Sequence, residues 1–513
     1  MSLKSVRARL RDIIGIGVAV TGVAAAVITA GAQAADTQEL RIGTTDMPPS
    51  LGNPFRNTGT PHVFTWSATF DGLTRIDRDG NVQPWLALSW ENLGPLRWRI
   101  KLRPGVTFSN GAPFTAGAVK TVVDYLRGPD AVREAMAREF AFLAGAEVVD
   151  NLTVDLLTRE PVPTLPRTLP LLYMVDPETW TRLGPDAFAR EPVATGPYRV
   201  ERMDENGWTL SAFAQSWRAP QIPRMRWIAA PDSATRVQAI LADQLDIALA
   251  LGPDEIAEIE AAGGTGSHWR TAVVWSIQFH QYGRDTPLND VRVREALNLA
   301  VDRQALIDGL LAGSTVPATQ PATRGTYGFD PSIPPIPFDR ARAKALLTDA
   351  GYPDGFKFVV QGVVGSAPSD GAMYQKVAQD LAAVGVTMEI RQFPVAELIR
   401  SVMEGNWNGD AFGMTFANEQ SVDALRSMQN HSCLWPHPWY CNQAVMPLIA
   451  AAKVEFDPER ALALRHEVMR FYRNDWSALY LYDMPRFAGL RAGVEGFEEV
   501  HGFVSVDRIT KKD

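Results

Sequence analysis

Residues 289–309, with the sequence NDVRVREALNLAVDRQALIDG, constrain the fold most, because they join a capping signal to an apolar face. Asn289 and Asp290 can accept hydrogen bonds from the first free backbone N–H groups of a helix. The apolar residues that follow recur at helical spacing: Val293, Ala296, Leu297, Ala300, Val301 and Leu306. The stretch therefore predicts a capped helix with one face buried.

The N-terminus has the pattern of a secretory signal. Four basic residues precede an apolar run, which ends in an Ala-Gln-Ala motif: Lys4, Arg7, Arg9 and Arg11 before residues 13–30 and 32–34. An uncleaved anchor is the alternative, since roughly 18 apolar residues can span a bilayer, but glycine and threonine dilute this run. We predict that residues 1–34 are a cleaved signal peptide and that the mature chain is periplasmic. No cysteine stands directly after the apolar run, so we do not expect a lipoprotein.

The charge and size of the chain exclude some classes of partner. Removal of the signal changes the formal net charge from −8 to about −11, which argues against nucleic acid. The remaining length, about 480 residues, is enough for two or three domains with substantial cores. No second hydrophobic segment approaches membrane-spanning length, so we do not expect the chain itself to form a transport path.

The chain has two cysteines, Cys433 and Cys441. In an oxidising compartment a close pair without competitors is most simply a disulfide. Closing so short a loop stabilises a protein by roughly 2.5 kcal/mol on the chain-entropy account. His431 and His437 suggest a zinc site as the alternative, but their spacing around C-x7-C fits no usual zinc finger or ribbon. We predict the disulfide and no metal site.

Predicted strands and helices alternate along the rest of the chain, which is typical of an α/β fold with mixed sheets. Residues 40–44 alternate like an edge strand, and residues 271–281 form a β-rich run without helical period. Thr115 and Asp339 each precede an apolar-periodic stretch and are expected to cap helices.

Several phrases of the sequence also occur, in the same order, in one protein family. They are G-x-x-F-S-N-G-x-P-x-T-A at 105–116, TGPYRVER at 195–202, the stretch 289–309, two helix–strand units at 339–351 and 373–393, and the tail at 478–497. Together they resemble the periplasmic solute-binding proteins of peptide and nickel ABC importers, the bacterial extracellular solute-binding family 5. The resemblance spans nearly all of the mature chain.

The resemblance implies a two-lobed periplasmic binding protein of type II, in the large cluster-C variant with an extra domain inserted in lobe one. Lobe one would comprise residues 35–63, 192–277 and 481–513, the inserted domain residues 64–191, and lobe two residues 278–480. Two such lobes can close around a solute. Ligand would stabilise the closed form, because only that form makes both sets of contacts.

The implied function is a monomeric receptor that captures a small solute, peptide or peptide-like, and delivers it to an inner-membrane ABC permease without a cofactor. Enzyme motifs are absent from the sequence: no P-loop, H-E-x-x-H or G-x-S-x-G occurs. Two alternatives stay open. One is a secreted hydrolase on a similar scaffold, and the other is a nickel-chelate receptor in which His431 or His437 could reach the metal.

Positions carried over from the family place ligand contacts on three segments. They are Asp46 and Met47 after the first strand, Trp275, Gln278 and His280 on the crossing strand, and Met414, Thr415, Phe416, Asn418 and Glu419 in lobe two. Trp275 and Phe416 could instead be core residues, and Asp46 and Glu419 could face solvent or cap a turn.

One departure from the family bears on the solute. Peptide-binding relatives have an aspartate that pairs with the ligand's α-ammonium group, and Ala417 stands at that position here. A buried ligand charge needs a partner. We therefore expect something other than a simple peptide, such as a modified peptide, an opine-like or sugar-like solute, or a chelated metal.

Overall fold

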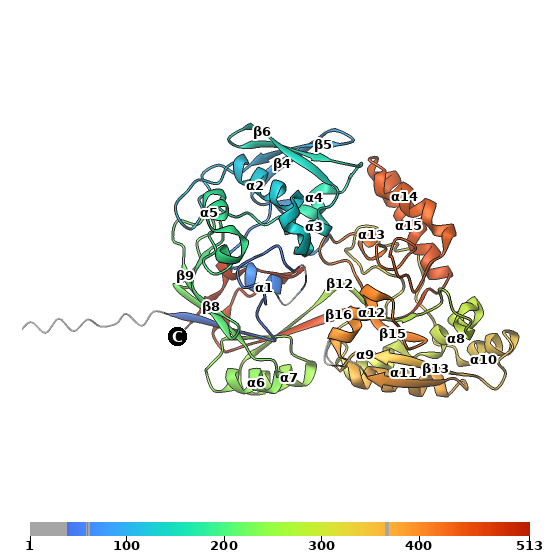
Figure 1. Cartoon of the computed structure of the whole chain (residues 1–513). Coiled ribbons are helices and arrows are strands. Elements are labelled where there is room, and N and C mark those ends of the chain that lie inside the picture. The colour runs from blue at the N-terminus through green and yellow to red at the C-terminus, as the bar shows by residue number, and fades with distance from the viewer. Residues whose placement is uncertain (1–37, 58, 60–61, 365–368, 393, 513) are drawn as a thin grey trace, which may run out of the picture. The chain divides into compact units, whose positions relative to one another are not determined.

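The computed structural model describes residues 38–512, apart from 58, 60–61, 365–368 and 393 (Figure 1). The predicted signal peptide lies outside the described residues. Within the described part of the chain, no helix combines the length and the apolar character that crossing a bilayer requires.

A mixed sheet organises the described chain, and its ten strands run in the order β14-β13-β15-β12-β16-β11-β1-β10-β9-β8. Their bounds are β1 (Glu39–Thr44), β8 (Tyr198–Asp204), β9 (Gly207–Ala212), β10 (Arg224–Ala229), β11 (Ile247–Leu249), β12 (Thr265–Phe279), β13 (Lys357–Gly362), β14 (Thr387–Gln392), β15 (Ala411–Ala417) and β16 (Ala478–Leu490). Parallel pairs, such as β1 with β10, and antiparallel pairs, such as β12 with β16, both occur. The predicted α/β class with a mixed sheet is confirmed.

Residues 64–191, which we call the insert, contain a separate antiparallel sheet in the order β4-β5-β7-β6. Its strands are β4 (Ala87–Gly94), β5 (Arg97–Leu102), β6 (Leu143–Asp150) and β7 (Thr153–Thr158). Short antiparallel pairs are formed by β2 (Thr74–Ile76) with β3 (Val82–Pro84), β17 (Val494–Glu495) with β20 (Thr510–Lys511), and β18 (Glu499–Val500) with β19 (Phe503–Val504).

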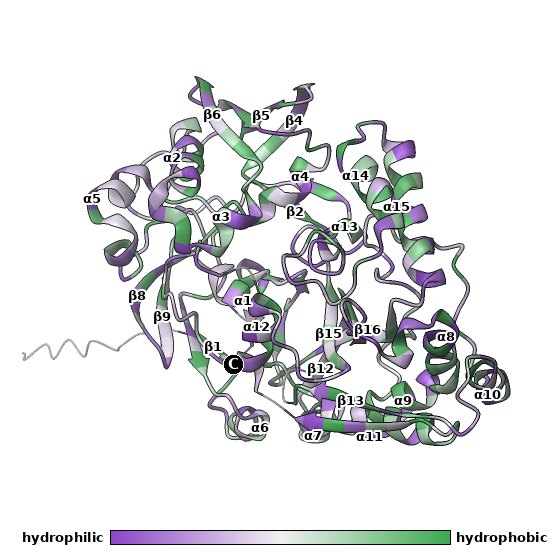
Figure 2. Cartoon of the chain, turned by 45° about the vertical axis from the view of Figure 1, so that its right-hand side comes forward, coloured by the Kyte–Doolittle hydropathy of each residue, from purple (hydrophilic) through white to green (hydrophobic). Residues whose placement is uncertain are grey.

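Helices cover these sheets: α7 packs on β12 and β16, α11 on β14, and α2 on β6. The helices are α1 (His62–Trp66), α2 (Ala116–Arg127), α3 (Ala135–Glu139), α4 (Leu165–Thr168), α5 (Pro177–Phe188), α6 (Ser233–Leu241), α7 (Pro253–Ala261), α8 (Val291–Ala300), α9 (Arg303–Leu310), α10 (Arg340–Asp349), α11 (Asp370–Ala382), α12 (Val395–Glu404), α13 (Ala424–Ser427), α14 (Met446–Val454) and α15 (Pro458–Asn474). Figure 2 shows hydrophobic and hydrophilic residues alternating along α15, whose buried face includes Val468, Met469 and Tyr472. Amphipathic helices of this kind bury one face on a core.

Two large hydrophobic cores lie at the two ends of the β12–β16 pair. The first contains Leu40 of β1 and Leu490 at the end of β16. The second contains Val274 and Ile277 of β12 and Tyr480 of β16. The two strands pair from Thr265 opposite Leu490 to Gln278 opposite Ala478, with irregularities near their middle. They therefore carry the chain from one core to the other.

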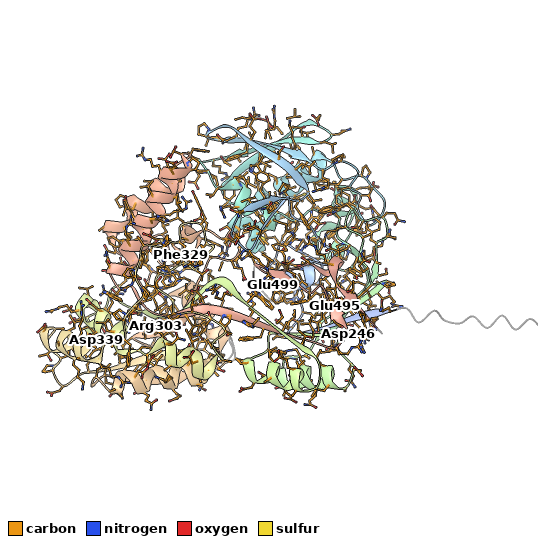
Figure 3. All side chains as sticks on the ribbon, turned by 180° about the vertical axis from the view of Figure 1, so that it is seen from behind. Asp246, Arg303, Phe329, Asp339, Glu495 and Glu499 are labelled. Atoms are coloured by element: carbon orange, nitrogen blue, oxygen red, sulfur yellow. A yellow bond between two sulfur atoms is a disulfide. The ribbon has the colours of Figure 1, made fainter. Side chains whose placement is uncertain are left out.

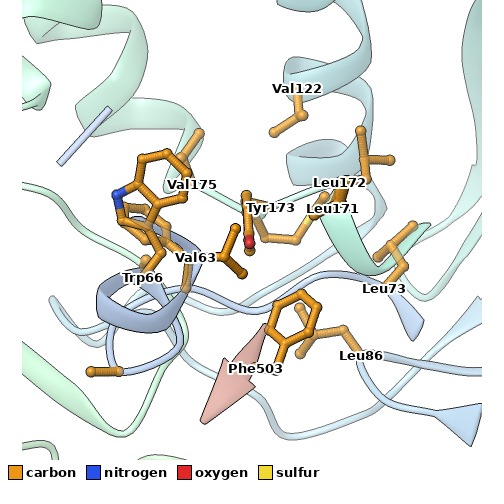
Figure 4. Close-up of a cluster of buried hydrophobic side chains, with 14 of the residues drawn as sticks. Val63, Trp66, Leu73, Leu86, Val122, Leu171, Leu172, Tyr173, Val175 and Phe503 are labelled. Atoms are coloured by element: carbon orange, nitrogen blue, oxygen red, sulfur yellow. The ribbon is translucent and has the colours of Figure 1, made fainter. Parts of the chain in front are cut away.

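The first core is continuous from β1 into the insert. Figure 4 shows Val63, which directly precedes the insert, and Phe503 of the C-terminal tail close to Trp66 and Tyr173 of the insert. Tyr173 and Phe503 meet edge to face, with ring centroids 6.4 Å apart. The insert therefore does not form its own large core, because its apolar residues pack into the same cluster as β1.

The prediction of an edge strand at residues 40–44 is wrong, because β1 lies inside the large sheet. It pairs in parallel with β10 on one side and with β11 on the other. Leu40 and Ile42 face the core, while Arg41 is bound to Asp246 and a side chain at Gly43 would overlap Leu245. Polar and apolar residues alternate because the two faces of the strand pack against different partners. One face lies on the hydrophobic core, and the other contacts Leu245 and Asp246.

The prediction of one helix over residues 289–309 is also wrong, because the chain forms α8 and α9 with a break at Val301. Asp290 accepts a hydrogen bond from the Arg292 backbone N–H as predicted, and Asp302 repeats this role for Ala305. Asn289 instead donates to the Arg284 carbonyl. A second capping aspartate ends the first helix, since it offers the backbone an alternative hydrogen bond.

The other two predicted caps lie where expected. Asp339 accepts a hydrogen bond from the Arg342 N–H at the start of α10. Thr115 stands at the N-cap of α2, but its side chain makes no capping hydrogen bond. The predicted disulfide is confirmed between Cys433 and Cys441, whose Cα atoms are 4.5 Å apart.

Arg303, labelled in Figure 3, is fully buried in the second core and ties α8 and α9 to β16. Its guanidinium donates to the backbone oxygens of Tyr480 and Asn298 at 2.6 and 2.8 Å. Burial, together with the charge of Arg473, lowers the pKa of Arg303 to about 9. The side chain satisfies carbonyls that the break between the helices leaves open.

We predict that Arg303→Met lowers the free energy of unfolding by about 3 kcal/mol, because several buried carbonyls lose their donor. Urea unfolding followed by circular dichroism measures this loss. Arg342→Met is the control, since Arg342 is exposed and its removal should cost under about 1 kcal/mol. Equal losses in the two variants would contradict the structural role of Arg303.

Candidate functional site

A crevice of about 360 Å³ lies where the insert meets residues 278–480, which we call lobe two. From the insert it is lined by Glu139, Phe140, Phe142, Glu160, Pro161, Val162, Thr164, Thr168 and Leu171. From lobe two it is lined by Gln420, Ser421, Asp423, Leu425, Arg426, Gln429, Ala450, Lys453, Val454 and Arg465. Small-molecule sites in proteins commonly have this size and mix of apolar and polar residues.

An ion pair spans the two sides of the crevice. The Nη2 of Arg426 in lobe two lies 2.6 Å from Oε1 of Glu139 in the insert. The Nη1 of Arg426 donates to the backbone oxygen of Ala417 at 3.0 Å. Both charged side chains are partly exposed, so the pair contributes modestly to stability. Its geometry nevertheless depends on the two sides being together.

The boundary between the insert and lobe two, which we call the seam, has a second contact at Tyr327 of lobe two. The guanidinium of Arg167, from the insert, lies 4.6 Å from the Tyr327 ring centroid. Arg465 of α15 lies 4.5 Å from the same centroid. Arg465 also pairs with both oxygens of Asp423 at 3.0 and 2.9 Å. Although burial opposes it, the Asp423 carboxylate raises the pKa of Arg465, which keeps the stacked cation charged.

The loop that follows β15 enters the seam. Val422 packs with Ile76 of the insert and Ala272 of β12 in a small buried cluster. Its φ of 50° is unusual for a β-branched residue. Strained residues of this kind persist only where their surroundings hold them, and they are frequent at binding sites. The next residues of the loop line the crevice.

Glu419, just before that loop, is held by a half-buried arginine. Arg486 of β16 binds both Glu419 oxygens at 2.6 and 2.7 Å and Oε1 of Glu499 at 2.9 Å. Its guanidinium also lies 5.4 Å from the ring centroid of Phe64. Figure 3 places Glu499 beside the crossing strands. One cation thus joins lobe two to the C-terminal tail and α1.

This cluster has one carboxylate more than it has cations. Burial and the Glu419 carboxylate together raise the pKa of Glu499 to about 7, although Arg486 acts in the opposite direction. Despite its own burial, the pKa of Arg486 is raised by these two carboxylates. The Glu499 carboxyl group is therefore easier to protonate than that of an ordinary glutamate.

The ten residues predicted from the sequence to contact ligand lie in different parts of the structure. Asp46 lies 3.3 Å from Nε2 of His62, and this hydrogen bond lowers the pKa of Asp46 despite partial burial. Met47 is buried in the first core. Trp275 and Phe416 belong to the second core, and Met414 and Thr415 are half-buried on β15.

The polar members of the set have partners within the protein or are buried. Gln278 donates to Ser276 Oγ at 2.7 Å and lies 3.2 Å from His431 Nδ1. Asn418 donates to the Pro321 carbonyl and accepts from the Ser427 N–H. His280 packs near Trp407, and burial together with the charge of Arg284 lowers its pKa to about 4.

None of the ten predicted residues is among those that line the crevice. The lobe-two segment comes nearest, because Gln420 and Ser421 directly follow Glu419. Sequence reasoning missed Glu139, Arg426 and Lys453, since each lies outside the three segments carried over from the family. Lys453 follows the apolar run of α14, and a single charge after such a run was the local signal in the sequence that could have indicated a functional lysine.

His431, considered as a metal ligand, is buried and lies 3.1 Å from the Thr415 backbone oxygen through its Nε2. Burial lowers its pKa to about 3. Over the residues described, no group of three or more His, Cys, Asp or Glu side chains is placed to hold a metal ion.

Two cores joined by crossing strands, with a crevice at the seam, define a two-lobed α/β binding protein of type II. A family model described as "Bacterial extracellular solute-binding proteins, family 5 Middle" matches residues 81–430, and the chain belongs to this family. Family 5 proteins bind peptides or related solutes for import by ABC transporters, and this chain is a solute-binding protein of that kind.

Relatives and solved structures agree with this assignment. The glutathione-binding protein GsiB of Salmonella typhimurium is 28% identical over 414 residues, which cover 78% of this chain and 80% of the relative. The substrate-binding protein CtaP of Listeria monocytogenes has a TM-score of 0.81 at 17% identity. HbpA2 of Haemophilus parasuis has a TM-score of 0.78 at 20% identity. Each structure covers 93% of this chain and 100% of its own length, so the fold is shared throughout.

We predict that stability falls as pH rises through about 7. Glu499 and the buried Asp483 both have pKa values raised to about 7, chiefly by burial. A carboxyl group whose pKa is raised on folding stabilises most below its unfolded value and loses that contribution as pH rises through its folded value. The slope is at most about 1.4 kcal/mol per pH unit for each group.

Urea unfolding of the wild type and of Glu499→Gln between pH 5.5 and 8 measures this dependence. The variant should have the shallower slope, because one titrating group is gone while Asp483 remains. Glu495→Gln is the matched control, since Glu495 is exposed and should leave the slope unchanged. A Glu499→Gln slope equal to that of the wild type would contradict the assignment.

Proposed function

We propose that the mature chain, beginning near residue 35, is a monomeric periplasmic receptor that binds a peptide-like solute and presents it unchanged to an inner-membrane ABC permease. The observation that carries the proposal is the crevice between the insert and lobe two, whose walls come from the two sides of the seam. A solute held there contacts both sides at once. Its binding therefore favours the arrangement in which the sides are together.

A glutathione-like solute is the best-supported class. The relative that aligns over 78% of the chain is named as a glutathione-binding protein. Glutathione joins its first residue through a side-chain carboxyl group, so its ammonium group lies away from the position that it has in an ordinary peptide. This geometry agrees with Ala417 at the position where peptide-binding relatives have an aspartate.

The neighbouring acidic residue does not replace that aspartate. Glu419 is engaged on both oxygens by Arg486, and the Ala417 carbonyl accepts from Arg426. We therefore propose that the ammonium partner is a different residue, one that lines the crevice. The ten contacts carried over from the family stay a prediction, as do the proposed lobe boundaries and the cleavage after residue 34.

Isothermal titration calorimetry of the purified mature chain tests the proposal with four probes: glutathione, glutathione disulfide, γ-Glu-Cys and Ala-Ala. We expect saturable one-to-one binding of at least one γ-linked probe and weaker binding of Ala-Ala. Mass spectrometry of the released ligand should recover it intact.

Two outcomes would contradict the proposal. Formation of a cleavage product would indicate the hydrolase alternative. Retention of nickel with free histidine in equilibrium dialysis, without binding of any γ-linked probe, would indicate a metal-chelate receptor instead.

A further inference from the structure

Two charged residues that line the crevice have no partner at bonding distance. Arg426 pairs with Glu139, and Arg465 pairs with Asp423. The other two charged residues of the lining are Lys453 and Glu160. Neither side chain forms a hydrogen bond or an ion pair with another residue in the described ranges.

These two residues come from opposite sides of the seam. Lys453 is half-buried in the last turn of α14 in lobe two, and Glu160 is exposed in the insert after β7. Burial lowers the pKa of Lys453, while the carboxylates of Glu160 and Asp423 raise it. The Lys453 ammonium is thus partly removed from water, with only distant carboxylates to compensate it. An anion within hydrogen-bond distance would supply what it lacks.

Apolar side chains line the same space. Phe140 and Leu171 of the insert and Leu425 of lobe two are almost fully buried at its walls. Phe140 and Phe142 also contact each other, with ring centroids 5.9 Å apart. A molecule in the crevice would therefore meet a cation from one side, a carboxylate from the other and apolar surface as well.

We propose that this crevice recognises a zwitterion, with Lys453 binding a carboxylate of the solute and Glu160 binding its ammonium group. The inference rests on the proposed function and names the residues that set its specificity. In this proposal Glu160 of the insert binds the ammonium group of the solute. Ala417 of lobe two, which stands where peptide-binding relatives have an aspartate, has no charge to do so. A zwitterion that touches both residues bridges the seam, so recognition and closure become one event.

The test compares Lys453→Met and Glu160→Gln with wild type by titration calorimetry. The probes are glutathione, N-acetylglutathione, which lacks the ammonium group, and glutathione with its glycine carboxylate amidated. Each variant should bind glutathione about 10-fold or more weakly, the loss expected for one charge-assisted hydrogen bond. Lys344→Met and Glu205→Gln, at exposed positions away from the crevice lining, are the controls and should bind as wild type does.

The modified probes distinguish recognition from a general weakening. Glu160→Gln should bind N-acetylglutathione as wild type does, because that probe has no ammonium group to lose. Lys453→Met should weaken the amidated probe less than it weakens glutathione. Glutathione affinities within twofold of wild type in both variants would overturn the inference and leave the receptor function standing.

Failure of the proposed function would look different. If the wild type binds none of the three probes, a screen of zwitterionic, anionic and neutral solutes follows, with tryptophan fluorescence as the signal. Binding of only non-zwitterionic solutes would overturn this inference alone. Absence of saturable binding to every solute in the screen would overturn both.

Discussion

The antiparallel ladder between β12 and β16 is the interaction on which the rest of the structure depends. Its two strands run through the second core at one end and reach the first core at the other. Strands of 15 and 13 residues are long for a globular protein. Their register shifts lie near the middle of the pair, where a bulge allows a local bend. The same backbone hydrogen bonds therefore join the cores and leave a place where the pair can flex.

The seam between the insert and lobe two has a different character. It is closed by separate side-chain contacts: a partly exposed ion pair at Glu139, a stacked tyrosine at Tyr327 and the small cluster around Val422. Contacts of this kind are individually weak, so they can part without unfolding either core. The Arg486 cluster lies closer to the crossing strands and is more deeply buried. A receptor that opens and closes needs both features: a stable connection between the lobes, as at β12 and β16, and weak contacts at the seam.

The sequence predicted most of the fold because its signals are local. Capping aspartates at 290 and 339 and the helix of α2 lie where the pattern placed them. The errors arose where a distant segment decides the outcome. Residues 40–44 look like an edge strand until Leu245 and Asp246 cover their second face. The stretch 289–309 has the pattern of one continuous helix, but Asp302 accepts a hydrogen bond from the Ala305 N–H and so begins a second helix.

The site was much harder to predict than the fold. Cysteines eight residues apart suffice to predict a disulfide, but Glu160 and Lys453 are nearly 300 residues apart and belong to no shared motif. Only folding brings them to one crevice. The direct test of the account is a distance measurement across the seam by double electron–electron resonance, with spin labels at Val149→Cys and Ala451→Cys, which are both exposed. Saturating glutathione should shorten and narrow the distance distribution; an unchanged distribution with bound ligand would contradict closure around the solute.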